Sequence, residues 1–129
     1  MKISLDFDGV LSQLAWQTVA VSFQENDHQV YIVTGRCREQ GARVLDVADQ
    51  LDIPREQVIF TCNRDKWEAI QAEGIELHLD NNAEQLALIE TLTEAYGLNT
   101  SEVPPYDVLR QDLDEYTDQE DEEDDDLTD

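Results

Sequence analysis

The stretch ISLDFDGV, residues 3–10, joins a short apolar run to two carboxylates and a glycine. The apolar run is typical of a buried strand, and residues two apart in a strand point to the same face of the sheet. Gly9 lets the backbone turn sharply after the second acid. The stretch therefore predicts that Asp6 and Asp8 lie at the carboxyl end of a strand, where α/β sheets bind their ligands.

Strand and helix patterns alternate along the rest of the chain up to residue 97. Strands are expected at residues 2–6, 30–33, 58–60 and 76–79, and helices at 14–24, about 44–51, 65–73 and about 83–96. We expect Leu14 and Tyr96 on the core faces of the first and last helices, and Gly74 and Gly97 just after the last two. This alternation predicts an α/β fold, a Rossmann-like three-layer sandwich with a central parallel sheet of about four to five strands.

The chain has 129 residues, enough for one domain, and a formal net charge of −23. Residues 100–129 hold 14 Asp or Glu against one Arg, and the preceding residues hold 17 against seven Lys or Arg. So acidic a body disfavours nucleic acid and anionic membranes as partners, without excluding nucleic acid. It favours divalent cations and basic partners.

Three segments differ in composition. Residues 1–99 are expected to form the folded core, residues 100–117 a linker or docking segment, and residues 118–129 a disordered acidic tail. Pro104-Pro105 suggests a stiff connection. The tail either keeps the protein in solution or recruits a basic protein partner. A short amphipathic turn that docks on the body is expected from Val108, Leu109, Leu113 and Tyr116.

The cysteine content is low and no apolar run is long enough to cross a membrane. Cys37 and Cys62 lack the spacing of a metal site, and two cysteines do not suggest a secreted disulfide scaffold. We expect both to be reduced thiols in a cytoplasmic protein. Residues 1–8 do not resemble a signal peptide.

Four short motifs each follow or flank an expected strand. In chain order they are DFDGV at 6–10, VTGR at 33–36, RDK at 64–66 and LDNN at 79–82. Together, and over roughly residues 2–97, they resemble the haloacid dehalogenase superfamily of phosphohydrolases. Each motif alone is weak, but all four in this order are hard to obtain by chance.

The resemblance implies a phosphomonoester hydrolase that works through an aspartyl-phosphate. Asp6 matches the nucleophile, and Asp8 matches the general acid and base. Lys66 matches the catalytic lysine that neutralises charge beside the phosphoryl group, and Arg64 is the alternative cation. Phosphate binding falls to the segment after the second strand, namely Thr34, Gly35 and Arg36.

The resemblance also implies Mg²⁺ as cofactor. Its ligands would be the Asp6 carboxylate, the Asp8 backbone carbonyl and Asp80, since Mg²⁺ prefers hard oxygen atoms. The family often has a second acid beside the last of these positions, where this chain has Asn81. Glu84 is a possible substitute, and a weaker metal site is one implication of the difference.

Two further expectations concern the surroundings of the site. The segments between the first three strands have room for one helix each, so the cap modules of the family are absent and the site is open. An open site suits a large or partner-presented phosphorylated substrate. Structural roles are expected for four residues, although Trp16 could instead be a substrate platform: Trp16, Trp67, His28 and His78.

The alternative to an enzyme is a non-catalytic binding or regulatory protein with the same fold. Such a protein would use its acidic tail to hold a basic partner. Loss of Mg²⁺-dependent turnover in Asp6→Asn distinguishes the two.

Overall fold

The structure, a computed structural model, describes residues 1–110. At its centre is a sheet of five parallel strands in the order β3-β2-β1-β4-β5. The predicted α/β fold with a parallel, Rossmann-like sheet is confirmed. The strands are β1 (Lys2–Leu5), β2 (Gln29–Thr34), β3 (Val58–Phe60), β4 (Leu77–Asp80) and β5 (Tyr96–Asn99).

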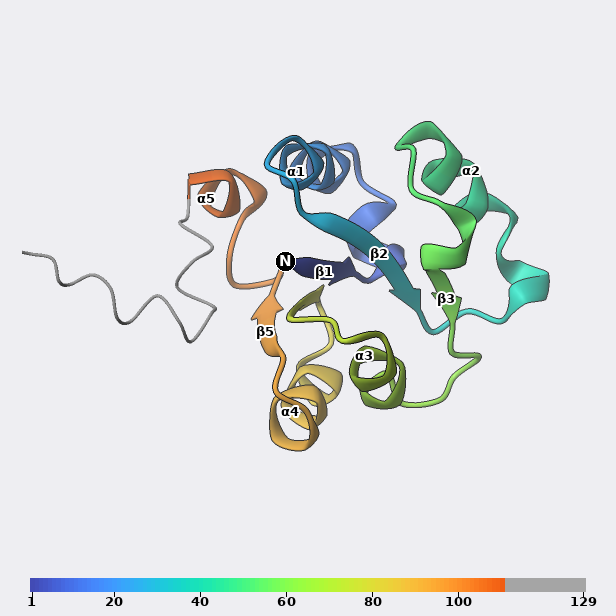
Figure 1. Cartoon of the computed structure of the whole chain (residues 1–129), viewed down its shortest axis with the longest axis vertical. Coiled ribbons are helices and arrows are strands. Elements are labelled where there is room, and N and C mark those ends of the chain that lie inside the picture. The colour runs from blue at the N-terminus through green and yellow to red at the C-terminus, as the bar shows by residue number, and fades with distance from the viewer. Residues whose placement is uncertain (111–129) are drawn as a thin grey trace, which may run out of the picture.

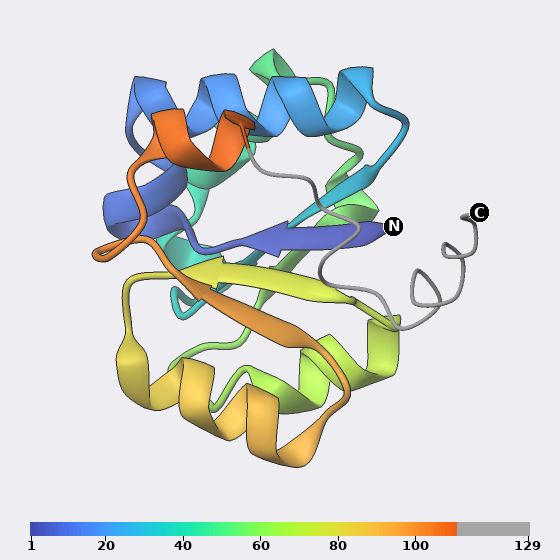
Figure 2. The same cartoon turned by 90° about the vertical axis from the view of Figure 1, so that its left-hand side faces the viewer.

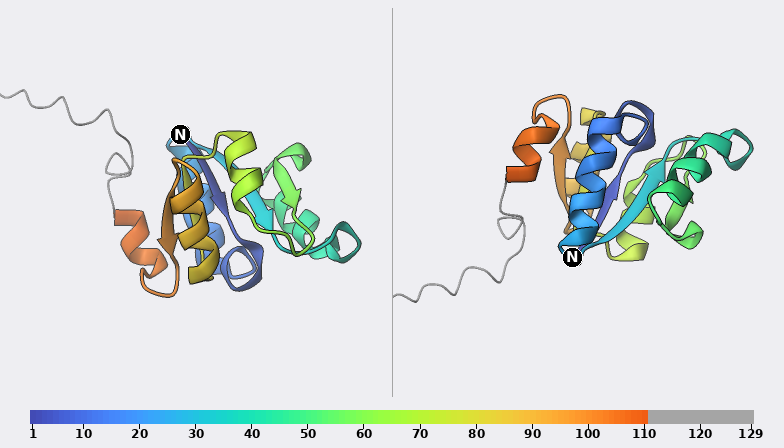
Figure 3. Two further views of the ribbon diagram at one scale, coloured as in Figure 1. Left: turned by 90° about the horizontal axis from the view of Figure 1, so that it is seen from below. Right: turned by 90° about the horizontal axis from the view of Figure 1, so that it is seen from above.

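Helices cover both faces of this sheet (Figures 1 and 2). One layer holds α1 (Leu14–Glu25), α2 (Ala42–Gln50) and α5 (Pro105–Arg110), and the other holds α3 (Trp67–Glu73) and α4 (Ala83–Leu92). Figure 3 shows each layer in front of the sheet. Short turns occur at η1 (Phe7–Leu11), η2 (Arg38–Gln40) and η3 (Arg55–Gln57). No cap domain interrupts residues 1–110, as expected.

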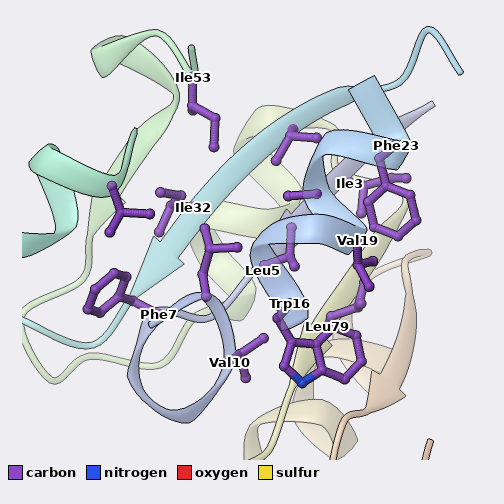
Figure 4. Close-up of a cluster of buried hydrophobic side chains, with 14 of the residues drawn as sticks. Ile3, Leu5, Phe7, Val10, Trp16, Val19, Phe23, Ile32, Ile53 and Leu79 are labelled. Atoms are coloured by element: carbon purple, nitrogen blue, oxygen red, sulfur yellow. The ribbon is translucent and has the colours of Figure 1, made fainter. Parts of the chain in front are cut away.

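The two faces of the sheet differ in polarity. Ile3 and Leu5 of β1 point toward α1 and join the larger apolar cluster there, which includes Val19 and Phe23 (Figure 4). Because side chains alternate along a strand, Ser4 points to the opposite face, below α3 and α4. The apolar cluster on that face is smaller, and this leaves room for buried polar groups.

The last expected helix is too long, and this prediction was wrong. Helix α4 ends at Leu92, and Thr93 has an extended backbone with its hydroxyl hydrogen-bonded to the Ile89 carbonyl. The chain then forms β5, which pairs in parallel with β4. The chain forms a fifth strand here instead of continuing the helix, because this strand covers the unpaired edge of β4.

Gly97 therefore lies inside a strand and does not end a helix. A Cβ atom there would come within 2.8 Å of the Leu86 side chain, so the glycine lets α4 lie close to β5. Leu14 and Tyr96 were expected in the core but are 73% and 38% exposed. Leu14 opens α1, and the buried face of that helix begins only at Trp16.

The prediction of two reduced thiols was also wrong, because Cys37 and Cys62 form a disulfide. The two cysteines follow the ends of β2 and β3, which are neighbouring strands with Thr34 paired to Phe60. That strand order brings the two loops together. Sequence spacing alone could not show it.

Part of the predicted segment 100–117 is α5, which packs against α1 (Figure 2). Pro105 is its first residue, a favoured position for proline in a helix. Val108 is buried, whereas Leu109 is exposed. Leu113, Tyr116 and the predicted tail at 118–129 lie outside the described residues.

Candidate active site

The four sequence motifs meet at the carboxyl ends of the strands. The chain runs outward from β1 to β3 through one helical layer, and from β4 to β5 through the other. The crevice of such a sheet lies where the order reverses, here between β1 and β4. A hollow of about 580 Å³ opens there, lined by Asp6, Asp8, Gly35, Arg36, Gln40, Asn63, Arg64, Lys66, Asp80, Asn81, Asn82 and Gln85.

Lys66 joins two buried carboxylates at the base of the hollow. Its ammonium lies 2.9 Å from Asp6 Oδ1 and 2.7 Å from Asp80 Oδ2. All three residues are buried, at the ends of β1 and β4 and at the start of α3. One cation shared by two carboxylates in a site of low polarity holds all three side chains in place.

The backbone of Lys66 is held as well. Its amide donates to Gln85 Oε1 at 2.9 Å, and Gln85 Nε2 donates to Asp65 Oδ1 at 3.0 Å. Helix α4 thus fixes the turn from which the ammonium reaches the two acids. The sequence did not predict the role of Gln85, because Gln85 is far from Lys66 along the chain and belongs to none of the four motifs.

The two buried carboxyls titrate in opposite directions. Burial raises the pKa of Asp6 from 3.8 to about 6, with Lys66 opposing the rise and Asp80 adding to it. Burial also acts to raise the pKa of Asp80, but His78 and Lys66 outweigh it and lower that pKa to about 2. The pair therefore holds a permanent anion next to a carboxyl that gains its charge near neutral pH.

A chain of hydrogen bonds supports Asp80 from below. His78 Nε2 lies 2.8 Å from Asp80 Oδ2, and His78 Nδ1 lies 2.6 Å from Ser4 Oγ. Burial lowers the pKa of His78, so the ring is neutral and donates through Nε2 while Ser4 donates to Nδ1. A structural role was expected for His78, but nothing in the sequence pointed to Ser4.

Asp8 faces the opening of the hollow. Arg36 binds it with two hydrogen bonds, of 2.7 and 3.1 Å, and the guanidinium lies over the Phe7 ring. The hydrogen bond from Arg36 is the main reason that the pKa of Asp8 falls below its usual value. With 58% of its side chain exposed, Asp8 can reach a bound molecule more easily than Asp6 can.

Thr34 lies behind the hollow and does not line it. The side chain is fully buried, and its hydroxyl accepts a hydrogen bond from the Arg36 amide at 3.2 Å. Gly35 and Arg36 do line the hollow. The structure thus brings together seven of the eight residues predicted for the site and places Thr34 beneath the loop.

Asp80, Asn81 and Asn82 line the hollow beside the loop of Asp8. Asn81 Nδ2 lies 3.5 Å from the Asp8 carbonyl, and Asn82 Oδ1 caps α4. A Cβ at Gly9 would lie 2.5 Å from Asn81 Nδ2, so glycine makes the close approach possible. Within residues 1–110 no three acid, histidine or cysteine side chains gather to hold a metal. The donor set fits Mg²⁺ when carbonyl, amide and water oxygens join Asp6 and Asp80.

Several other polar residues line the hollow that no sequence motif singled out, namely Gln40, Asn63 and Asn82. Trp16 is in the core and does not line the hollow, so the substrate-platform alternative fails.

Comparison with known proteins gives no match: no family model, no curated protein and no solved structure resembles the chain. No helix among the described residues is long and apolar enough to cross a membrane.

Proposed function

We propose that this chain is a Mg²⁺-dependent phosphomonoester hydrolase of the haloacid dehalogenase type. The observation that carries the proposal is the Lys66 ammonium held between Asp6 and Asp80 at the β1–β4 crevice, with Asp8 at the opening. Phosphoryl transfer requires a nucleophile, a proton donor and positive charge at one point. In our proposal Asp6 is the nucleophile, Asp8 is the proton donor and Lys66 supplies the positive charge.

In the proposed mechanism the Asp6 carboxylate attacks phosphorus, and the ester oxygen leaves with a proton from Asp8. A water molecule then attacks the aspartyl-phosphate, Asp8 takes up its proton, and inorganic phosphate is released. Lys66 holds Asp6 in place and faces the negative charge of the phosphoryl group.

Arg36 sets a condition for the proton transfer from Asp8 in this mechanism. Its hydrogen bonds keep Asp8 ionised in the free protein, since they lower the pKa of that carboxyl. Asp8 therefore becomes a proton donor only when the substrate takes over Arg36. Phosphoryl oxygens are suitable partners because the guanidinium binds them in the same two-pronged way as it binds a carboxylate.

Mg²⁺ would be held by Asp6, Asp80, the Asp8 carbonyl and Asn81. When bound, the ion supplies positive charge to the phosphoryl oxygens. Because Asn81 is neutral, we expect this site to bind Mg²⁺ more weakly than one with a third carboxylate. Asp8 is well exposed and residues 1–110 contain no cap, which favours a large or partner-presented phosphorylated substrate.

The test is hydrolysis of p-nitrophenyl phosphate by the full chain, with Mg²⁺ and with a chelator. We expect Mg²⁺-dependent turnover that Asp6→Asn abolishes. Asp49→Asn is the matched control, since Asp49 pairs with Arg55 on the surface, away from the hollow. Mass spectrometry of rapidly quenched protein should find one phosphate on the peptide that contains Asp6.

Turnover that survives Asp6→Asn, or that does not depend on a divalent ion, would overturn the proposal. No turnover on a broad panel of phosphomonoesters, by a folded protein that also fails to bind Mg²⁺, would favour the non-catalytic binding protein. The basic partner of that alternative would contact residues 118–129, which lie outside the described residues.

From composition we propose the cytoplasm, where thiols are kept reduced. This proposal conflicts with the Cys37–Cys62 bond of the structure, and the state of that bond in the cell decides between the two. Protein alkylated during extraction from its natural host should carry two blocked thiols if the compartment is reducing. An intact bond would place the protein in an oxidising compartment.

A further inference from the structure

The loop between β3 and α3 is held in an unusual conformation. Cys62 and Asn63 both have left-handed backbone angles, with φ of 53° and 67°. Left-handed angles are unfavourable for residues other than glycine, although asparagine tolerates them best, and they persist where the surroundings enforce them.

Several bonds enforce this conformation. Cys62 is joined to Cys37, its amide donates to the Arg36 carbonyl at 3.2 Å, and the Asn63 amide donates to the Gly35 carbonyl at 2.8 Å. The Arg64 amide donates back to Thr61 at 3.1 Å. The loop is therefore fixed to the segment that carries Arg36, and it presents Asn63 and Arg64 at the mouth of the hollow.

Arg64 differs from the other two cations of the hollow. Arg36 binds Asp8, and Lys66 binds Asp6 and Asp80, but the Arg64 side chain has no ion pair or hydrogen bond with any residue in 1–110. It borders both the main hollow and a second one of about 420 Å³ beside β3. Arg64 is thus a cation on a fixed loop, and its side chain lacks an anion.

The lining of the main hollow restricts what can bind beside the phosphoryl group. It consists of acids, cations, amides and one glycine, and no apolar or aromatic side chain lines it. A ligand there gains hydrogen bonds and ion pairs but no contact with an apolar or aromatic side chain. The part of a substrate that enters the hollow is therefore best compact and rich in oxygen, whatever the size of the rest of the substrate.

We propose that Arg64 and Asn63 form a second anion subsite, which selects phosphomonoesters that carry another acidic group close to the phosphoryl group. The second group is a carboxylate or a second phosphate, both of which pair with a guanidinium. This inference rests on the proposed function, since the first phosphoryl group is taken to bind at Asp6 and Lys66.

The test is a comparison of matched ligands by calorimetry, in Mg²⁺, on the Asp6→Asn protein, which binds without turnover. Glycerol 3-phosphate and 3-phosphoglycerate are similar in size, but only the second has a carboxylate. A hexose monophosphate and the corresponding bisphosphate make the same comparison for a second phosphate. We expect the ligand with the extra anion to bind about tenfold more tightly, the effect of one charge-assisted hydrogen bond.

Adding Arg64→Gln should remove this preference, because it weakens the binding of 3-phosphoglycerate more than that of glycerol 3-phosphate. Arg55→Gln is the control, because Arg55 binds Asp49 and does not line the hollow. Equal affinity for the paired ligands, no binding of either, or a preference that survives Arg64→Gln would overturn the subsite. Selective binding by a protein whose Asp6-intact form shows no turnover would instead overturn the proposed function and leave the subsite standing.

Discussion

At the scale of single residues, the ionised carboxylate of Asp6 lowers the stability of the folded protein, because it is buried. Its folded-state pKa of about 6 lies above 3.8, so folding favours the protonated form. The stability associated with the neutral carboxyl is fully present below about pH 4 and is lost as the pH rises to about 6. Carboxyl groups with a pKa shifted in this way are common at functional sites.

We therefore predict that Asp6→Asn stabilises the metal-free protein above pH 6. Asparagine keeps the shape of the side chain and carries no charge to bury. The melting temperature of the variant should therefore exceed that of the wild type at pH 8. At pH 4.5 the difference in melting temperature between variant and wild type should be smaller, because Asp6 is then largely protonated. Thermal unfolding in a chelator at both pH values measures the difference, and an equal gap at the two would contradict the raised pKa.

A second prediction concerns His78, which links Ser4 to Asp80. His78→Leu preserves much of the volume but leaves two buried polar groups without a partner, which should cost about 1–3 kcal/mol of unfolding free energy. His78→Gln keeps an N–H near Asp80 and should cost less. Urea unfolding of the two variants tests the difference, and equal losses would mean that packing alone explains the histidine.

The sequence predicted much of the site because parallel strands bring their carboxyl ends to one edge. Asp6 directly follows β1 and Asp80 ends β4, so their positions relative to the strands sufficed to place both acids. Ser4 and Gln85 were missed because their roles depend on which strands and helices are neighbours. The order of the strands and helices in space cannot be predicted from the local sequence.

At the scale of elements, the first three strands and the first helix were predicted nearly to their ends, and the failures came later. Residues 83–96 have helical spacing, yet tertiary pairing turned the last of them into β5. Local patterns describe a segment alone, whereas the unpaired edge of β4 belongs to the folded sheet. The disulfide was missed for the same reason, since it depends on β2 lying beside β3.

The docking of α5 on α1 can be tested with two neighbouring residues. Val108 is 2% exposed and Leu109 is 41% exposed. Val108→Ala should lower the unfolding free energy by about 1.5–3 kcal/mol, from two lost methyl groups and the cavity that they leave. Leu109→Ala should change it by about 0.5 kcal/mol or less. Chemical denaturation of both variants decides whether α5 belongs to the cooperative unit.

At the scale of the whole molecule, the Cys37–Cys62 bond closes a loop with a sequence separation of 25 that contains α2 and β3. Closing a loop of that size restricts the unfolded chain and stabilises the fold by about 3 kcal/mol. The double variant Cys37→Ser, Cys62→Ser should lose up to this amount. A thiol reductant should destabilise the wild type by a similar amount and leave the variant unchanged, and a reductant effect on the variant would point to another cause.

The charge of the chain is unevenly divided between the two edges of the sheet. Residues 36–66, which form α2, β3 and the loops around Arg36 and Arg64, hold six Lys or Arg and six Asp or Glu. The other described residues, up to residue 110, hold two Lys or Arg against 13 Asp or Glu. This edge of the described body is therefore less negative than the rest, and Arg36 and Arg64 bring its positive charge to the hollow. An approaching anion is turned away by most of the surface and meets the least resistance at that edge, so encounters are oriented mouth first.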